Sequence, residues 1–133
     1  MTGVQTCALP ILPVVVKNEY DAKTKTHFFE TQEREFDFDF SLCCQMKWEA
    51  KFPELAKRET IVDYTSRISK LPASVATLLS KMKAVYCFIG GECLSFEGFV
   101  RLFDFTRKDY VRTLTERLSE VLALFEDEAT EKN

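Results

Sequence analysis

The chain opens with segments that have the composition of β-strands. Residues 14–20, VVVKNEY, and residues 26–30, THFFE, are rich in β-branched and aromatic residues. Residues 21–24, DAKT, lie between them and have the side chains of a tight turn. The pattern predicts two antiparallel strands joined by a short turn.

A strict alternation follows in residues 35–41, EFDFDFS. Phe36, Phe38 and Phe40 would share one face of an extended chain, with acidic residues and a serine on the other. Residues 31–34, TQER, can form a second turn. We therefore expect a third strand and a three-stranded antiparallel meander, with one face in water and the other covered by helices.

The apolar period then changes from two to four. A helix that ends near Pro53 is predicted, because proline disfavours continuation. Its broad apolar side would consist of two rows, Leu42, Met46 and Ala50 in one and Cys44, Trp48 and Phe52 in the other.

Three longer helices are predicted by their stripes and their ends. Thr60 and Thr106, each with aspartate three residues later, are typical helix starts. Pro72 would open the middle helix, and Gly90 with Gly91 would end it. The stripes are Ile61, Tyr64, Ile68 and Leu71; Val75, Leu78, Leu79, Met82, Val85, Tyr86 and Ile89; and Tyr110, Val111, Leu114, Leu118, Val121, Leu122 and Phe125.

Residues 95–105, SFEGFVRLFDF, carry more apolar side chains than one short helix normally hides. Ser95 can cap a helix whose face holds Phe96, Phe99, Val100 and Phe103, while Leu102 and Phe105 fall off that face. One interpretation is a helix wedged into the core on two sides. The other is a partner-binding patch made of Phe96, Phe99, Leu102, Phe103 and Phe105.

These elements indicate an α+β, mainly helical protein. We expect an N-terminal three-stranded antiparallel β-meander followed by about five helices packed as a small bundle. Residues 12–127 would form a single globular domain, and residues 128–133 a polar tail. Residues 1–11, MTGVQTCALPI, resemble an in-frame translation of a sequencing adapter, so we expect an artefactual leader there.

Composition narrows the possible partners. The chain is 46% apolar and 29% charged, with a net charge of −3 and a pI near 5.3. This balance creates no global attraction for nucleic acid or for an anionic membrane. The sequence holds no apolar run of the roughly 20 residues that a membrane span needs. We expect a soluble protein.

Cysteine spacing does not predict a metal site. Beyond Cys7 of the leader, Cys43 and Cys44 are adjacent, and no C-x-x-C motif exists. A disulfide between Cys87 and Cys93 across the two glycines is conceivable, but reduced thiols of a cytosolic protein are the simpler interpretation.

No constellation predicts catalysis. His27 is the only histidine and lies in a strand without a nucleophile motif nearby. Asp37 and Asp39 would share a strand face, where acids commonly guard an edge against aggregation; acid/base work or Mg²⁺ binding is the alternative. We expect no enzyme, with no catalytic, cofactor-binding or metal-binding residues.

A basic cluster leaves nucleic acid as an alternative partner. Arg101, Arg107, Lys108 and Arg112 surround a helix-turn-helix-like junction, as in a small DNA-binding regulator. Acidic residues are interspersed, and Arg112 with Glu116 has the spacing of a helical ion pair. A solvated face of mixed charge is the interpretation we favour.

Three short phrases carry a family resemblance over most of residues 35–125. They are W-E-x-x-F-P at Trp48, Glu49, Phe52 and Pro53; K-A-V-Y-C-F at residues 83–88; and S-F-x-x-F at Ser95, Phe96 and Phe99. In this order, after an acidic and aromatic strand, they resemble the small tail assembly chaperones of long-tailed, siphovirus-like bacteriophages.

The resemblance implies a non-catalytic protein of the host bacterial cytoplasm. Such chaperones coat the tape-measure protein and recruit tail-tube protein during virion morphogenesis, which makes these two the expected partners. The resemblance fixes no functional residue and leaves self-association open. A structural phage protein retained in the virion is a further alternative.

Overall fold

The computed structural model describes residues 11–90 and 94–131. Six α-helices follow a two-stranded antiparallel sheet in the described part of the chain. The elements are β1 (Ile11–Asp21), β2 (Thr26–Glu35), α1 (Cys43–Lys51), α2 (Pro53–Ala56), α3 (Ile61–Ser69), the 3₁₀ helix η2 (Val75–Thr77), α4 (Leu78–Phe88), α5 (Phe96–Val100) and α6 (Lys108–Glu131). The α+β class expected from the sequence is confirmed, with six α-helices where about five were expected.

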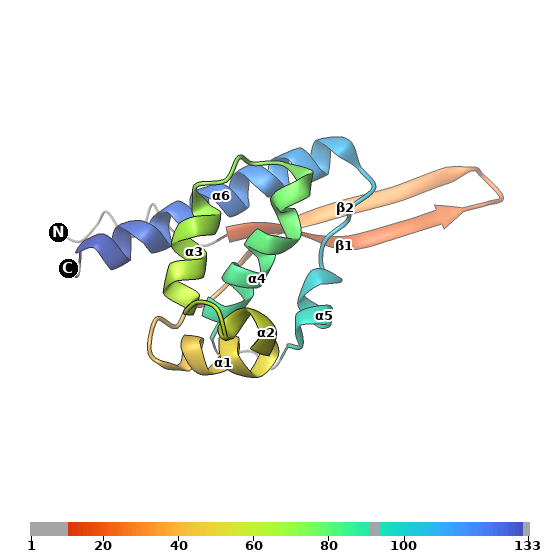
Figure 1. Cartoon of the computed structure of the whole chain (residues 1–133). Coiled ribbons are helices and arrows are strands. Elements are labelled where there is room, and N and C mark those ends of the chain that lie inside the picture. Colours follow the sequence, from red (N-terminus) through yellow and green to blue (C-terminus); the bar gives the residue numbers. More distant parts are fainter. Residues whose placement is uncertain (1–10, 91–93, 132–133) are drawn as a thin grey trace.

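The hairpin is longer than predicted. β1 and β2 pair from Ile11 opposite Glu35 to Asp21 opposite Thr26, with an irregularity between Val15 and Lys17. The far end of the hairpin projects past the helices (Figure 1). At its base, β1 is inserted into the helical body, where the amide of Val15 donates to the carbonyl of Leu102 at 2.8 Å.

The predicted third strand and the turn before it are wrong. Residues 31–34 belong to β2, where they pair with residues 12–15 of β1. The segment after Glu35 leaves the sheet and crosses to the end of α4, where Phe38 forms an isolated bridge with Ile89. The amide of Asp39 donates to the carbonyl of Phe88 at 2.7 Å, and that of Gly90 to the carbonyl of Asp37 at 2.9 Å.

Gly90 permits this crossing. A Cβ at this position would lie 2.9 Å from the Cβ of Asp39, closer than side chains normally approach. The glycine therefore does more than end a helix, since it admits the Phe-rich segment beside the end of α4. Phe36 is 2% exposed and Phe40 is 43% exposed, so the expected common apolar face holds only in part.

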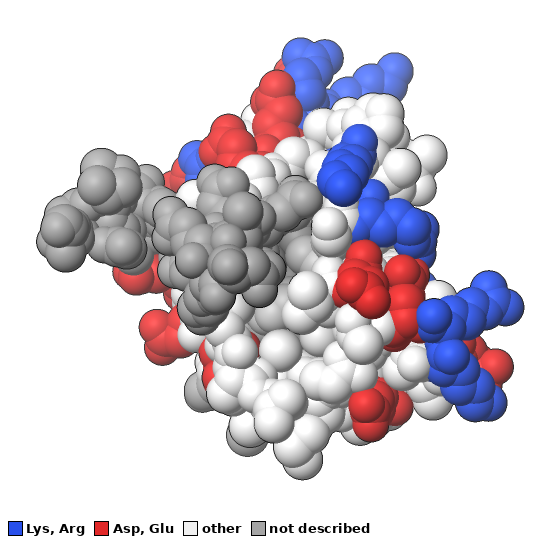
Figure 2. All heavy atoms as spheres, turned by 60° about the vertical axis from the view of Figure 1, so that its left-hand side comes forward, with Lys and Arg blue, Asp and Glu red and all other residues white. Residues whose placement is uncertain are grey.

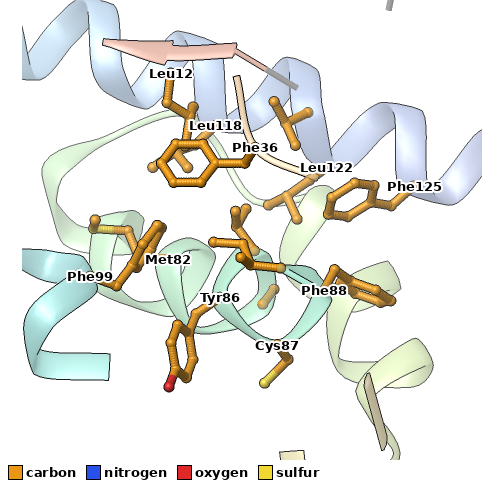
Figure 3. Packing of buried hydrophobic residues seen from close by; sticks show 14 of the residues in the cluster. Leu12, Phe36, Met82, Tyr86, Cys87, Phe88, Phe99, Leu118, Leu122 and Phe125 are labelled. Carbon is orange, nitrogen blue, oxygen red and sulfur yellow. The ribbon is translucent and has the colours of Figure 1, made fainter. Parts of the chain in front are cut away.

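The core lies between α4 and α6. Leu12 and Phe36 enter it from the N-terminal segment and face Leu118 and Leu122 of α6 (Figure 3). The whole predicted α6 stripe is buried, which confirms this helix, and it continues to Glu131, past the boundary expected at residue 127. Full burial of one such side chain stabilises the fold by about 1.5–3 kcal/mol.

Helix starts were predicted with mixed success. The Thr60 side chain accepts a hydrogen bond from the amide of Asp63, and that of Ser95 from the amide of Gly98, so both caps are confirmed. α4 does not open at Pro72, since a 3₁₀ turn with a Ser74 capping box precedes it. α6 begins at Lys108 and not at a Thr106 cap.

α1 is a surface helix with a single packed row. Cys44 and Trp48 are buried, and the Trp48 indole donates to the carbonyl of Glu59 at 2.9 Å. Leu42 and Met46 of the second row are 82% and 67% exposed, so the broad apolar side predicted for this helix is wrong. Among the described elements, α1 contacts α2, α3 and α4, and α4 lies between α6 above and α1 with α2 below (Figure 1).

Candidate docking groove

An apolar groove of about 310 Å³ lies between α4 and the segment that joins α5 to α6. Its floor is made by buried side chains, and its rim by exposed ones. The lining residues are Leu78, Leu79, Met82, Val100, Phe103, Asp104, Phe105 and Leu114. We refer to these eight residues as the α4–α6 groove.

Two exposed side chains form the rim of the α4–α6 groove. Leu79 is 59% exposed and Phe105 is 65% exposed. Leu79 is exposed because its neighbour Leu78, which is 5% exposed, takes the position that faces the core. Two residues before Phe105, the Phe103 ring packs edge-to-face against Phe99, with ring centres 5.2 Å apart. Adjacent positions on a helix point in different directions, so Leu78 and Leu79 cannot both face the core.

Asp104 is the charged residue in the lining. Its carboxylate accepts a hydrogen bond from the Thr106 hydroxyl at 3.0 Å, which organises the turn before α6. Thr106 is thus used within the loop and does not cap α6. The groove can therefore receive apolar side chains, with a single carboxylate at its edge.

The structure divides the five residues expected to form a partner-binding patch. Phe103 and Phe105 line the groove. Phe99 is fully buried, Phe96 packs against Phe52 and Tyr86 with ring centres 5.1 and 5.4 Å away, and the Leu102 carbonyl is used by β1. The interpretation of a helix wedged into the core therefore describes Phe96 and Phe99, while partner binding at Phe103 and Phe105 stays a prediction.

Leu79 is the groove residue that sequence reasoning placed elsewhere. It was expected in the buried stripe of its helix, although it directly follows another leucine. The α4 stripe proper is buried at Leu78, Met82, Val85 and Tyr86. The doubled leucine was the available signal that one of the two would be exposed.

A second cavity of about 590 Å³, lined by both polar and apolar residues, lies on the other side of α4. Tyr86 and Cys87 point toward that side, away from α6 (Figure 3). Lys47 also lines it, with its Nζ donating to the Ile89 carbonyl at 3.1 Å and lying 4.0 Å from the centre of the Tyr86 ring.

The two buried thiols of this cavity, Cys44 and Cys87, are poor nucleophiles. Burial raises the pKa of the Cys87 thiol to about 12, and burial also raises the pKa of Cys44. A thiol must be deprotonated to attack or to bind a metal, so both are inert near neutral pH. Cys43, Cys44 and Cys87 are free; Cys93 lies outside the described residues.

The other residues considered for catalysis or metal binding are His27, Asp37 and Asp39, and they do not form a common site. His27 pairs with Asn18 at 2.5 Å on the exposed hairpin. Asp39 accepts from the backbone amide of Ser41, and hydrogen bonds with that serine lower its pKa, while Asp37 is exposed. Within residues 11–90 and 94–131, no group of three or more histidine, cysteine or acidic residues could hold a metal ion.

The basic cluster is interspersed with acids. Arg101 lies 3.3 Å from Glu97, and the Arg107 guanidinium lies 4.1 Å from the centre of the Phe29 ring. Arg112 pairs at 4.0 Å with Asp109, so the expected pairing with Glu116 is wrong. Lys and Arg also lie beside Asp and Glu on the face shown in Figure 2.

Comparison with protein-family models, with curated proteins and with solved structures finds no match. None of the helices in the described ranges is both long enough and apolar enough to cross a membrane.

Proposed function

We propose that this protein is a non-catalytic phage tail assembly chaperone of the host cytoplasm. Its partners are the tape-measure protein, the tail-tube protein or both, which it binds during tail morphogenesis. The observation that supports this proposal is the α4–α6 groove, where Leu79 and Phe105 expose apolar surface beside a fully formed core.

The resemblance and the groove support different parts of the proposal. Trp48 is fully buried, Phe52 packs against its ring, and Ser95 caps α5, so these three residues of the resemblance are scaffold residues. The resemblance therefore supports the expected fold and not a particular binding site. The groove bears on the activity, because exposed apolar side chains can shield apolar segments of a partner from water.

Co-expression with the tape-measure protein of the same genome tests this function. We expect the chain to increase the soluble fraction of that partner and to co-purify with it. Leu79→Asp and Phe105→Asp should each weaken the complex by about tenfold or more, because each removes apolar contact area and places a charge in the α4–α6 groove.

Leu42→Asp is the matched control. Leu42, the N-cap residue of α1, is 82% exposed and lies outside the groove, so the same change there should leave the complex intact. A tape-measure protein that stays insoluble with the wild-type chain contradicts the function. A complex that only Leu42→Asp disrupts moves the docking site to α1.

A further inference from the structure

The α4–α6 groove has room for a few side chains of a partner. Its volume of about 310 Å³ lies at the lower end of the roughly 300–1,000 Å³ that is usual for ligand pockets. Its floor is closed, because Leu78, Met82 and Leu114 are at most 5% exposed. A partner would therefore lie across the rim and insert apolar side chains between Leu79 and Phe105.

The walls of the groove provide no row of free backbone groups. One wall is α4, where the backbone groups bond along the helix. In the other wall the Leu102 amide donates to the Phe99 carbonyl at 3.1 Å, and the Phe103 amide donates to the Val100 carbonyl at 3.2 Å. The Leu102 carbonyl accepts from the amide of Val15 at 2.8 Å.

This use of the backbone favours a helical partner over an extended one. An extended segment covered by apolar side chains needs partners for its own N–H and C=O groups, and leaving them unpaired is costly. An α-helix forms these hydrogen bonds internally. The α4–α6 groove therefore suits the apolar stripe of an amphipathic helix, which contributes side chains alone.

Asp104 is the charge that such a helix would meet. Its side chain is half-buried in the lining, and its two carboxylate oxygens lie 3.0 and 3.1 Å from the Thr106 hydroxyl, which donates to them. Among residues 11–90 and 94–131, Asp104 forms no ion pair. A carboxylate with a single neutral donor can accept further hydrogen bonds, and a cation provides the best electrostatic match.

We propose that the α4–α6 groove binds an amphipathic helix in which a lysine or arginine stands beside the apolar stripe. This inference rests on the proposed function and adds the form and the charge of the segment that is recognised. Apolar side chains spaced three and four residues apart enter between Leu79 and Phe105. The basic side chain pairs with Asp104 at the edge of the groove.

Peptide binding tests the form of the occupant. The probes are overlapping synthetic peptides, each about five helical turns long, that together cover the tape-measure protein of the same genome. Fluorescence anisotropy should show that the peptides which bind have an amphipathic pattern with a basic residue beside it. Circular dichroism should show that these peptides gain helix on binding.

Changes at Asp104 test the charge. Asp104→Asn keeps an oxygen that can accept from Thr106 but removes the charge, so it should weaken peptide binding about three- to tenfold, and Asp104→Lys should weaken it further. Added salt should weaken the wild-type complex more than the Asp104→Asn complex, because salt screens the ion pair. A peptide whose basic residue is replaced by glutamate should bind Asp104→Lys better than it binds the wild type.

Two control variants separate the charge from the structure of the loop. Thr106→Ala removes the hydrogen bond to Asp104 but keeps the carboxylate, so it should bind peptide like the wild type. Asp21→Lys is a matched change outside the groove, because Asp21 is also half-buried and accepts a hydrogen bond from a residue two positions later, at 2.9 Å from the Lys23 amide. It should leave binding unchanged.

The outcomes separate this inference from the proposed function. A tape-measure protein that neither dissolves nor binds in the presence of the wild-type chain overturns both. If that complex forms, the inference alone is overturned when no bound peptide gains helix, or when Asp104→Lys, shown by circular dichroism to be folded, binds like the wild type.

A second copy of the chain is the other occupant that the measurements can detect. A wild-type dimer in sedimentation velocity that Leu79→Asp abolishes would assign the groove to self-association and overturn the inference. If Asp104→Lys loses its fold, Asp104→Asn decides, since it retains an acceptor for the Thr106 hydroxyl. Unchanged affinity and unchanged salt dependence in Asp104→Asn would then overturn the inference.

Discussion

Lys81 is the least expected residue in the molecule. Its side chain is fully buried in α4, yet its ammonium group donates to the Leu71 carbonyl at 3.0 Å and to the Ser119 hydroxyl at 2.8 Å. The first contact holds the loop after α3 and the second reaches α6. One lysine thus joins three parts of the bundle through neutral acceptors, and burial lowers its pKa.

The lowered pKa of Lys81 determines how its contribution to the free energy of unfolding changes with pH. The unfolded chain, in which Lys81 has a pKa near 10.5, binds its proton more tightly than the folded chain. The contribution of this residue to the free energy of unfolding therefore rises as pH increases toward 10.5 and is lost as pH falls. Lys81→Met should abolish that rise.

Urea unfolding of wild type and Lys81→Met between neutral pH and 10.5 measures this effect. The quantity to compare is the difference in unfolding free energy between the two proteins, in which the contributions of other titrating groups cancel. Lys83→Met, on the same helix but half-buried, is the control. A difference that does not vary with pH for Lys81→Met contradicts the prediction.

At the scale of elements, helix ends are determined by single hydrogen bonds. The Thr60 hydroxyl accepts from the Asp63 amide at 3.1 Å and satisfies one of the free amides at the start of α3. Thr106 has the same local sequence pattern, but its hydroxyl donates to Asp104 instead. Two threonines that look alike in sequence therefore act differently.

Alanine substitution distinguishes the two threonines. Thr60→Ala should lower the free energy of unfolding by about 1 kcal/mol, the usual cost of losing a cap. Thr106→Ala should cost less, because its hydroxyl contributes a single exposed hydrogen bond within a loop. Thermal or urea unfolding measures both, and equal losses would show that α3 does not depend on its cap.

At the scale of the whole molecule, the hairpin combines two environments. Its base belongs to the core, where Leu12 is fully buried and Val14 is 4% exposed. Its far end, which includes Tyr20 at 63% and Phe28 at 44% exposure, projects from the body (Figure 1). An isolated two-stranded hairpin is only marginally stable in water.

Hydrogen exchange should separate these two parts. We expect the amides of Leu12, Val14 and Val15 to be protected about as strongly as the core of α4 and α6, because they open only with global unfolding. Amides of residues 18–28 should exchange orders of magnitude faster through local opening. Exchange measured by mass spectrometry provides this comparison, and uniform protection along the hairpin contradicts it.

Much of the local structure was predictable from the sequence. The α6 stripe, the Thr60 and Ser95 caps and the first hairpin turn depend on residues close together in the chain, where backbone geometry and short hydrogen bonds decide the outcome. Of the candidate site, Phe103 and Phe105 were predictable as surplus apolar residues.

Tertiary structure alone decided which apolar surfaces meet. An alternating segment such as residues 36–40 can join a sheet or cross to a helix, and the close approach of Asp39 to Gly90 determined the second outcome. The exposure of Leu42 and Leu79 and the burial of Lys81 likewise depend on neighbours distant in sequence. The periodicity of the sequence predicts which side chains share one face of a helix or strand. The packing of other elements against that face determines whether it is buried.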